Sequence, residues 1–127
     1  LVEAHFSNYP LLFVCPSDER DVRITISQIH THKIRGADIL LIAEKNPELA
    51  MAVAGRPSGQ DRYWSQYLEV PASSDANLFV FAASIILQRL AFRMSVLKMD
   101  YLDELKVVDH GVHPDSPKNV SKSITVD

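Results

Sequence analysis

The sequence is poor in the residues on which several classes of protein depend. Among its 127 residues there is one cysteine, Cys15, which excludes an internal disulfide and a cysteine-rich zinc site. Cys15 lies in an apolar run, so we expect a buried and unreactive thiol. The 4 glycines form neither a G-x-G-x-x-G nor a G-x-x-x-x-G-K-[ST] motif, so neither of these phosphate-binding loops is present. We expect no cofactor and no metal.

An excess of positive charge is also missing. The formal net charge is −3, and the calculated isoelectric point is about 5.9, so we expect no nucleic-acid partner. No stretch has the composition of a signal peptide. The most apolar segment, Phe79–Leu87, is followed so closely by Gln88, Arg89 and Arg93 that we expect no membrane span. These absences predict a cytoplasmic protein.

What is present is the composition of an ordinary globular domain, with 46% hydrophobic and 23% charged residues. The length allows one domain. Because the chain begins at Leu1 and not at a methionine, we expect a piece of a longer protein. Short apolar runs at about 11–15, 38–43 and 67–70 predict three strands. The first two are continuously apolar, as is typical of strands buried on both faces of a parallel sheet.

Capping residues predict where the intervening helices begin and end. Ser17 is positioned to cap a first helix, and Gly36 is positioned to end it. That helix places apolar residues at helical spacing: Val22, Ile26 and Ile29. Asn46 followed by Pro47 opens a second helix that runs to about Val53. A third, long helix is expected from about Asn77 to Lys98. It is apolar on most sides, so we expect it to be buried against a partner or a second domain.

Alternating strands and helices predict the α/β class, with a parallel sheet between layers of helices in a three-layer sandwich. Three strands make a narrow sheet, since doubly wound domains normally have five or more. The chain therefore corresponds to about half of such a domain. We expect it to form a homodimer or to associate with the missing half, and Arg89 and Arg93 on the last helix suggest an intersubunit ion pair.

Several local groupings have a functional and a simpler interpretation. Glu44 and Glu48 flank the end of the second strand, where α/β sheets bind ligands, but exposed carboxylates near a helix start are the more common case. Two pairs of histidines are better explained as solvated or helix-terminal side chains than as metal ligands. They are His30 with His32, and His110 with His113. A basic and aromatic loop could cover an anion, although loop arginines are usually solvated: Arg56, Arg62, Tyr63 and Trp64.

The most specific signal is the segment from Asp115 to Asp127, D-S-P-K-N-V-S-K-S-I-T-V-D. It resembles the C-terminal tail of the glutamine–fructose-6-phosphate aminotransferase family, which ends D-x-P-R-N-L-A-K-S-V-T-V-E. Seven positions are identical: Asp115, Pro117, Asn119, Lys122, Ser123, Thr125 and Val126. The match also reaches the last residue of the chain, as it does in the family.

Fainter similarity extends upstream. The segment 87–93, L-Q-R-L-A-F-R, is similar to the family's L-Q-L-L-A-Y-H helix, with Arg89 and Arg93 as departures. The first strand is similar to the one that enters the second half of the family's last sugar isomerase (SIS) domain. The resemblance implies a SIS domain portion at 1–99 and an active-site tail at 114–127. Between them, 100–113 is a probable insertion.

In that family, SIS domains convert a ketose 6-phosphate into an aldose 6-phosphate while ammonia is added at C2. The resemblance implies that Lys122 is the catalytic lysine acting on the sugar carbonyl, and that Ser121 contacts the sugar through its backbone. The implied substrate is a hexose 6-phosphate, here fructose 6-phosphate, and the implied pathway is amino sugar biosynthesis. The isolated chain, without a phosphate loop or a base, is expected to be inactive. The alternative is a non-catalytic SIS-type module for sugar-phosphate binding or dimerisation.

Overall fold

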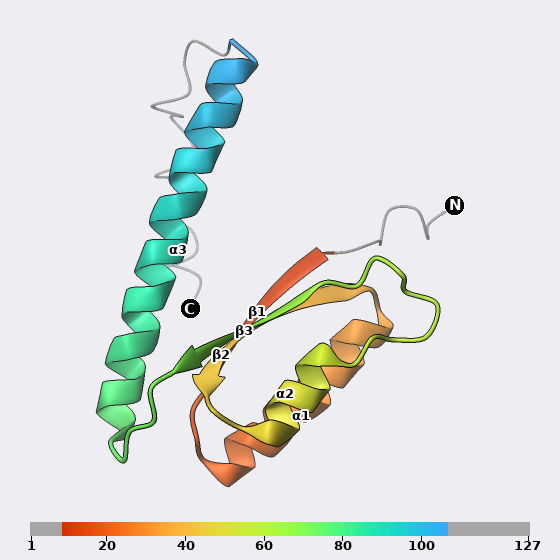
Figure 1. Cartoon of the computed structure of the whole chain (residues 1–127), viewed down its shortest axis with the longest axis vertical. Helices are drawn as coiled ribbons and strands as arrows, with labels where there is room; N and C mark the ends of the chain where they lie inside the picture. The colour runs from red at the N-terminus through yellow and green to blue at the C-terminus, as the bar shows by residue number, and fades with distance from the viewer. Residues whose placement is uncertain (1–8, 107–127) are drawn as a thin grey trace, which may run out of the picture. The chain divides into compact units, whose positions relative to one another are not determined.

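The computed structural model describes residues 9–106. Its elements alternate in the order β1 (Tyr9–Cys15), α1 (Glu19–Ile34), β2 (Ala37–Glu44), α2 (Pro47–Ala54), β3 (Ser65–Val70) and α3 (Ala76–Glu104). The chain divides into two compact units with the boundary between Ile86 and Leu87, inside α3. Figure 1 shows the elements coloured in chain order.

The three strands form one parallel sheet in the order β1-β2-β3. In its register, Phe13 of β1 lies opposite Leu41 of β2, and Leu41 lies opposite Tyr67 of β3. This confirms the parallel strands predicted at 11–15, 38–43 and 67–70. β2 is the central strand, and Ile39, Leu41 and Ile42 are fully buried in it. The mixed α/β class is therefore correct.

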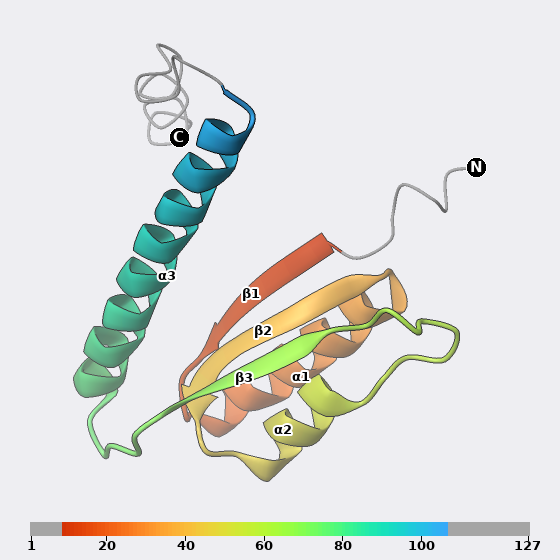
Figure 2. The same ribbon diagram turned by 45° about the horizontal axis from the view of Figure 1, so that its top comes forward.

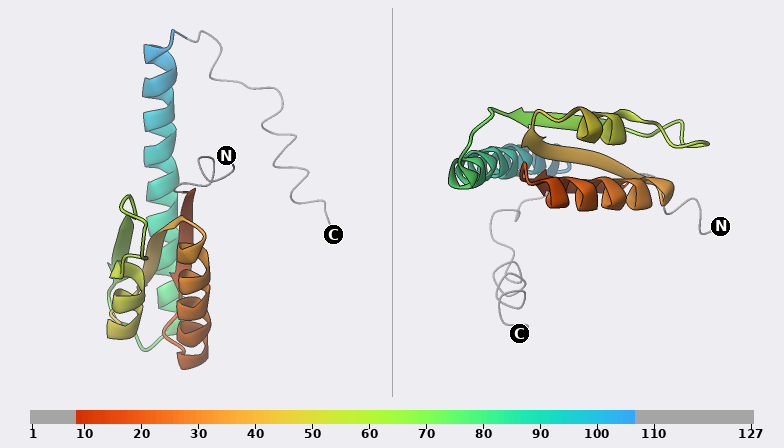
Figure 3. Two further views of the ribbon diagram at one scale, coloured as in Figure 1. Left: turned by 90° about the vertical axis from the view of Figure 1, so that its right-hand side faces the viewer. Right: turned by 90° about the horizontal axis from the view of Figure 1, so that it is seen from below.

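α1 and α2 cover the same face of this sheet and pack against each other. Figures 2 and 3 show both helices on one side of the strands. Parallel strands joined in sequence by right-handed crossovers place their helices in this way. The hydrophobic core lies between the sheet and the helices: Cys15, Val22, Ile29, Ala37, Ile39, Leu41, Ala43, Leu49, Ala52 and Val53. These elements make two layers, and the three-layer sandwich remains a proposal.

The other face of β1 is less well covered. Side chains alternate between the faces of a strand, and on β1 the alternate positions Leu12 and Val14 are 41% and 40% exposed. Neighbouring Ile42 on β2 is nevertheless fully buried. An apolar strand surface with this much exposure is a common site of association with another element or chain.

The helix ends follow the expected chemistry with one correction. Asp18, not Ser17, is the N-cap of α1, and its carboxylate accepts hydrogen bonds from the backbone N–H groups of Arg20 and Asp21. An ionised carboxylate at this position also interacts favourably with the helix dipole, which a hydroxyl does not. Gly36 has φ +93°, so it adopts the left-handed conformation expected after a helix C-terminus. Asn46 caps α2, and Pro47 occupies its first turn, as predicted.

α3 is longer than expected. It continues to Glu104 and not to about Lys98, because Tyr101, Leu102 and Leu105 keep apolar residues at helical spacing. The helix therefore includes residues 100–104 of the segment that we interpreted as an insertion. Among the residues of α3, Phe79 and Ala83 are buried. The expected burial of this helix against a partner or a second domain stays a prediction.

By length and composition alone, α3 is also apolar enough to cross a membrane. Length and composition do not by themselves place a helix in a membrane, because the core helices of soluble proteins share both properties. The expectation of no membrane span stays a prediction. Arg89 and Arg93 lie near the middle of α3, where each arginine would cost about 2.5–3.5 kcal/mol on insertion scales.

Candidate functional site

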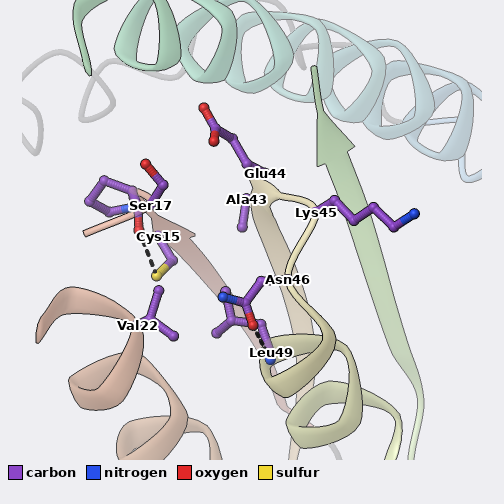
Figure 4. Close-up of a pocket in the computed structure, with 9 residues that line it drawn as sticks. Cys15, Ser17, Val22, Ala43, Glu44, Lys45, Asn46 and Leu49 are labelled. Carbon is purple, nitrogen blue, oxygen red and sulfur yellow. Dashed lines mark hydrogen bonds between the residues drawn. The ribbon is translucent and has the colours of Figure 1, made fainter. Parts of the chain in front are cut away.

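The carboxyl ends of β1 and β2 meet the first turns of α1 and α2, which is where parallel α/β sheets bind ligands. A cavity of about 40 Å³ lies there. Its lining comes from both strand ends and both helices: Cys15, Pro16, Ser17, Val22, Ala43, Glu44, Lys45, Asn46 and Leu49. Figure 4 shows these side chains. Drug-sized or substrate-sized ligands occupy about 300–1,000 Å³, so this cavity admits a water molecule and not a sugar phosphate.

Cys15 at the base of this cavity is fully buried, as predicted. Its thiol donates a hydrogen bond to the Pro16 carbonyl, with 3.3 Å between sulfur and oxygen. Burial raises the pKa of the Cys15 thiol. The thiol therefore stays protonated at neutral pH and is a poor nucleophile.

Glu44, which lines the cavity, also anchors a loop. Its Oε1 accepts a hydrogen bond from the Ser73 N–H at 3.1 Å, and its carbonyl accepts one from the Tyr67 hydroxyl. In Figure 4 the side chains of Glu44 and Lys45 point away from each other. Glu48 is exposed in the first turn of α2, where its charge suits the helix dipole. The simpler interpretation, an exposed carboxylate near a helix start, fits Glu48, whereas Glu44 is half-buried and anchors a loop.

Lys33 is the unusual residue that sequence reasoning missed. It is 4% exposed, and its ammonium donates a 2.6 Å hydrogen bond to the Ala52 carbonyl in the last turn of α2. The same nitrogen lies 5.1 Å from the centre of the Tyr63 ring, a cation–π distance. Burial lowers the pKa of Lys33. The spacing contained the signal, because Lys33 continues the core-facing series Val22, Ile26 and Ile29.

The basic and aromatic loop lies between α2 and β3, at the amino end of β3. It is therefore at the opposite end of the strands from the cavity. Its side chains close helix ends: the Tyr63 hydroxyl donates to the Val53 carbonyl, and the Gln60 amide donates to the carbonyls of Lys33 and Ile34. The Trp64 N–H donates to Asp38 at 2.9 Å. The loop is thus a cap for α1 and α2, and it does not adjoin the carboxyl ends of the strands.

The histidines do not form a metal centre in the described part of the chain. His30 is exposed, and half-buried His32 lies beside Phe13 with 6.3 Å between ring centres. Within residues 9–106, no three His, Cys, Asp or Glu side chains are grouped as a metal site would require. His110, His113 and the two site residues of the tail, Ser121 and Lys122, lie outside the described residues.

Two further depressions are shallow and open. One of about 380 Å³ lies on the outer surface of α1, and one of about 300 Å³ lies between α1 and α2 beside Met51 and His30. Neither adjoins the carboxyl ends of the strands. A scan of protein-family models and searches of curated proteins and solved structures find no match to this chain. The resemblance to the aminotransferase family therefore depends on the residues of the tail and of the helix before it.

Proposed function

We propose that this chain is the C-terminal part of a cytoplasmic phosphosugar isomerase or aminotransferase that acts on fructose 6-phosphate. The observation that carries the proposal is the tail motif Asp115–Asp127, with Lys122 at the position of the family's lysine. The parallel β-α-β-α-β arrangement is consistent with half of a SIS domain. Completing that domain would supply the third layer of the sandwich and further strands.

The chemistry assigned to Lys122 follows from its amine. A lysine acts on a carbonyl only through its neutral form, so the site must lower its pKa by removing water or by placing another cation nearby. In the proposed site, Lys122 opens the sugar ring and acts at C2, and the backbone at Ser121 holds the sugar. A carboxylate base for the proton shift between C1 and C2 would come from another part of the enzyme.

The described residues support a phosphate site in another part of the proposed enzyme. A phosphate group is usually bound by backbone N–H groups at a helix N-terminus. In α1 the carboxylate of Asp18 already accepts two of these N–H groups, and in α2 the side chain of Asn46 accepts two. Together with the 40 Å³ cavity, this occupancy supports a phosphate site outside α1 and α2.

The test is Lys122→Arg in the intact enzyme, assayed for conversion of fructose 6-phosphate. Arginine keeps the charge but does not deprotonate near neutral pH. We expect turnover to fall by roughly 10² or more, which is the scale for losing an acid–base group, with no change in melting temperature. Lys118→Arg is the matched control, because it introduces the residue that the family has at that position. Near-normal turnover of Lys122→Arg would contradict the proposal.

A second candidate is a non-catalytic SIS-type module for dimerisation or sugar-phosphate binding. The exposed apolar surface of α3 favours it, since such a surface suits association more than catalysis. The two candidates differ in one measurement. If the intact protein binds fructose 6-phosphate without converting it, and if Lys122→Arg leaves that affinity unchanged, the module is the better description.

A further inference from the structure

Four charged residues follow one stripe along the second half of α3. They are Arg89, Arg93, Asp100 and Glu104, all exposed. An α-helix advances by about 100° per residue, so these four positions fall within an arc of about 60°. Two basic residues therefore lie at one end of the stripe and two acidic residues at the other, with Val96 and Leu97 between them.

This arrangement is unfavourable in an isolated helix. Arg89 and Arg93 are like charges four residues apart, and so are Asp100 and Glu104; such pairs destabilise a helix. Within residues 9–106, none of the four side chains has an ion-pair partner. Between the charges, Leu97 is 53% exposed, and Phe92, about 60° to one side of the stripe, is 72% exposed. As far as the described residues go, the stripe thus combines charges that lack an ion-pair partner with exposed apolar groups.

A second copy of the same stripe complements it. If two α3 helices pack antiparallel about a two-fold axis between Val96 and Leu97, Arg89 lies opposite Glu104 of the other copy. The same axis places Arg93 opposite Asp100, because both pairs are centred on the same point of the sequence. Each ion pair then forms twice, on either side of a centre made by Val96 and Leu97. Arg93 and Asp100 are about 10.5 Å apart along the helix axis, so their two pairs flank the axis closely.

We propose that the stripe Arg89–Glu104 of α3 is a self-complementary interface through which two copies of this chain dimerise antiparallel. A two-fold interface must be complementary to itself, and one shared axis satisfies both charge pairs. A lipid bilayer satisfies neither, because it would leave two arginines in its centre without carboxylates. The interface does not depend on sugar-phosphate chemistry, so it stands or falls independently of the proposed function.

Charge reversal tests the register directly. In the whole chain, Arg89→Glu with Arg93→Glu makes every charge on the stripe negative, and Asp100→Arg with Glu104→Arg makes every charge positive. Each double variant should be monomeric by analytical ultracentrifugation, with self-association weakened by about a hundredfold as four attractive pairs become repulsive. An equimolar mixture of the two should form a heterodimer, since all four pairs are then opposite in sign. Combining the four substitutions in one chain should restore the homodimer.

The controls separate this interface from other occupants of α3. Lys98→Glu changes the charge on the far side of the helix and should leave dimerisation unchanged. Circular dichroism shows whether each variant remains folded. A wild-type chain that stays monomeric at 100 µM, or double variants that do not associate when mixed, would overturn the proposal. Flotation of the wild-type chain with phosphatidylcholine vesicles, equally strong for both double variants, would assign α3 to a membrane instead.

Discussion

The β1–β3 sheet with α1 and α2 differs from the second half of α3 in what it does with apolar residues. In the first region, Ile39 and Leu41 are fully buried between the strands and the helices. In the second, Phe92 and Met94 are 72% and 61% exposed. The two regions are similarly apolar in composition, so composition alone does not decide burial. Burial depends on the periodicity of the apolar residues together with the presence of other elements that cover them.

This difference indicates where each region derives its stability. The first region buries its apolar surface within one chain, so its folding depends on its own packing. The second has like charges at helical spacing and little burial, so its stability depends on what it contacts. Association through α3 would be the equivalent, between chains, of the packing that the sheet achieves within one chain.

The largest effect should come from truncating a core residue in the first region. Leu41→Ala removes a fully buried side chain from the central strand and should lower the free energy of unfolding by about 2–5 kcal/mol, because a cavity remains. Phe92→Ala, matched as a large apolar truncation at an exposed helical position, should change it by less than about 0.5 kcal/mol. Urea denaturation at a concentration where α3 does not self-associate measures both.

Equal losses in the two variants would contradict the difference in burial between the two regions. That result would mean that Phe92 is packed within one chain, and that the exposed half of α3 is part of the same core as the sheet. A loss confined to Leu41→Ala would support the difference. It would then be informative to repeat Phe92→Ala at high concentration, where dimerisation is measured.

The next effect concerns Lys33, the charged residue inside the first region. Lys33→Ala should lower the free energy of unfolding by about 2–3 kcal/mol, since it removes the hydrogen bond to the Ala52 carbonyl, the contact with the Tyr63 ring and the packing of the side-chain stem. Lys33→Met keeps the stem and should recover part of this loss. Thermal and urea denaturation of the two variants separate packing from polar contacts. A loss as large in Lys33→Met as in Lys33→Ala would show that the stem contributes nothing.

The pH dependence of stability gives an independent test of the same residue. Burial lowers the pKa of Lys33 in the folded state. Between that pKa and the unfolded value of about 10.4, the unfolded chain binds more protons than the folded chain. The contribution of Lys33 to the free energy of unfolding therefore rises with pH in this range. Cys15 acts oppositely above about pH 8.5, because burial raises its pKa. The difference between wild type and Lys33→Met therefore isolates the lysine, and a difference that does not change with pH would contradict its burial as a cation.

Much of the fold could be predicted because its signals are local. The apolar runs around Leu11 and Leu40 mark strands, and Asn46, Pro47 and Gly36 mark helix ends, each through the conformation of its own backbone. The helical spacing places Lys33 on the core-facing side of α1, but the carbonyl that accepts its hydrogen bond is 19 residues away in another helix and has no local signal. The end of α3 was misplaced because Asp100, Asp103 and Glu104 were interpreted as loop residues, although carboxylates are tolerated on an exposed helix.

The candidate site could be predicted less well than the fold. For Glu44 at the end of β2, the sequence left ligand binding open and favoured an exposed carboxylate, whereas in the structure this side chain holds the loop at Ser73. A carboxylate at a strand end has the same sequence signature whether it binds substrate or backbone. The assignments of Lys122 and Ser121 depend on the resemblance of the tail motif to that of the aminotransferase family, and they remain predictions.

The smallest predicted effect compares two adjacent residues at the start of α1. Sequence alone favoured Ser17 as the N-cap, whereas in the structure Asp18 accepts hydrogen bonds from the N–H groups of Arg20 and Asp21, at 3.0 and 3.4 Å. Asp18→Ala should therefore lower the free energy of unfolding by about 1 kcal/mol, the usual cost of losing an N-cap. Ser17→Ala should stay within about 0.5 kcal/mol, because an exposed hydroxyl outside the helix contributes little.

The pair of variants distinguishes the two assignments, since both replace a short polar residue by alanine at neighbouring exposed positions. If Ser17 caps the helix in solution, the order of the two losses is reversed. Asp18→Asn refines the result: asparagine caps about as well as aspartate, but it lacks the charge that favours the helix N-terminus by about 0.3–1 kcal/mol. A stability intermediate between wild type and Asp18→Ala would then apportion the effect of Asp18 between its hydrogen bonds and its charge.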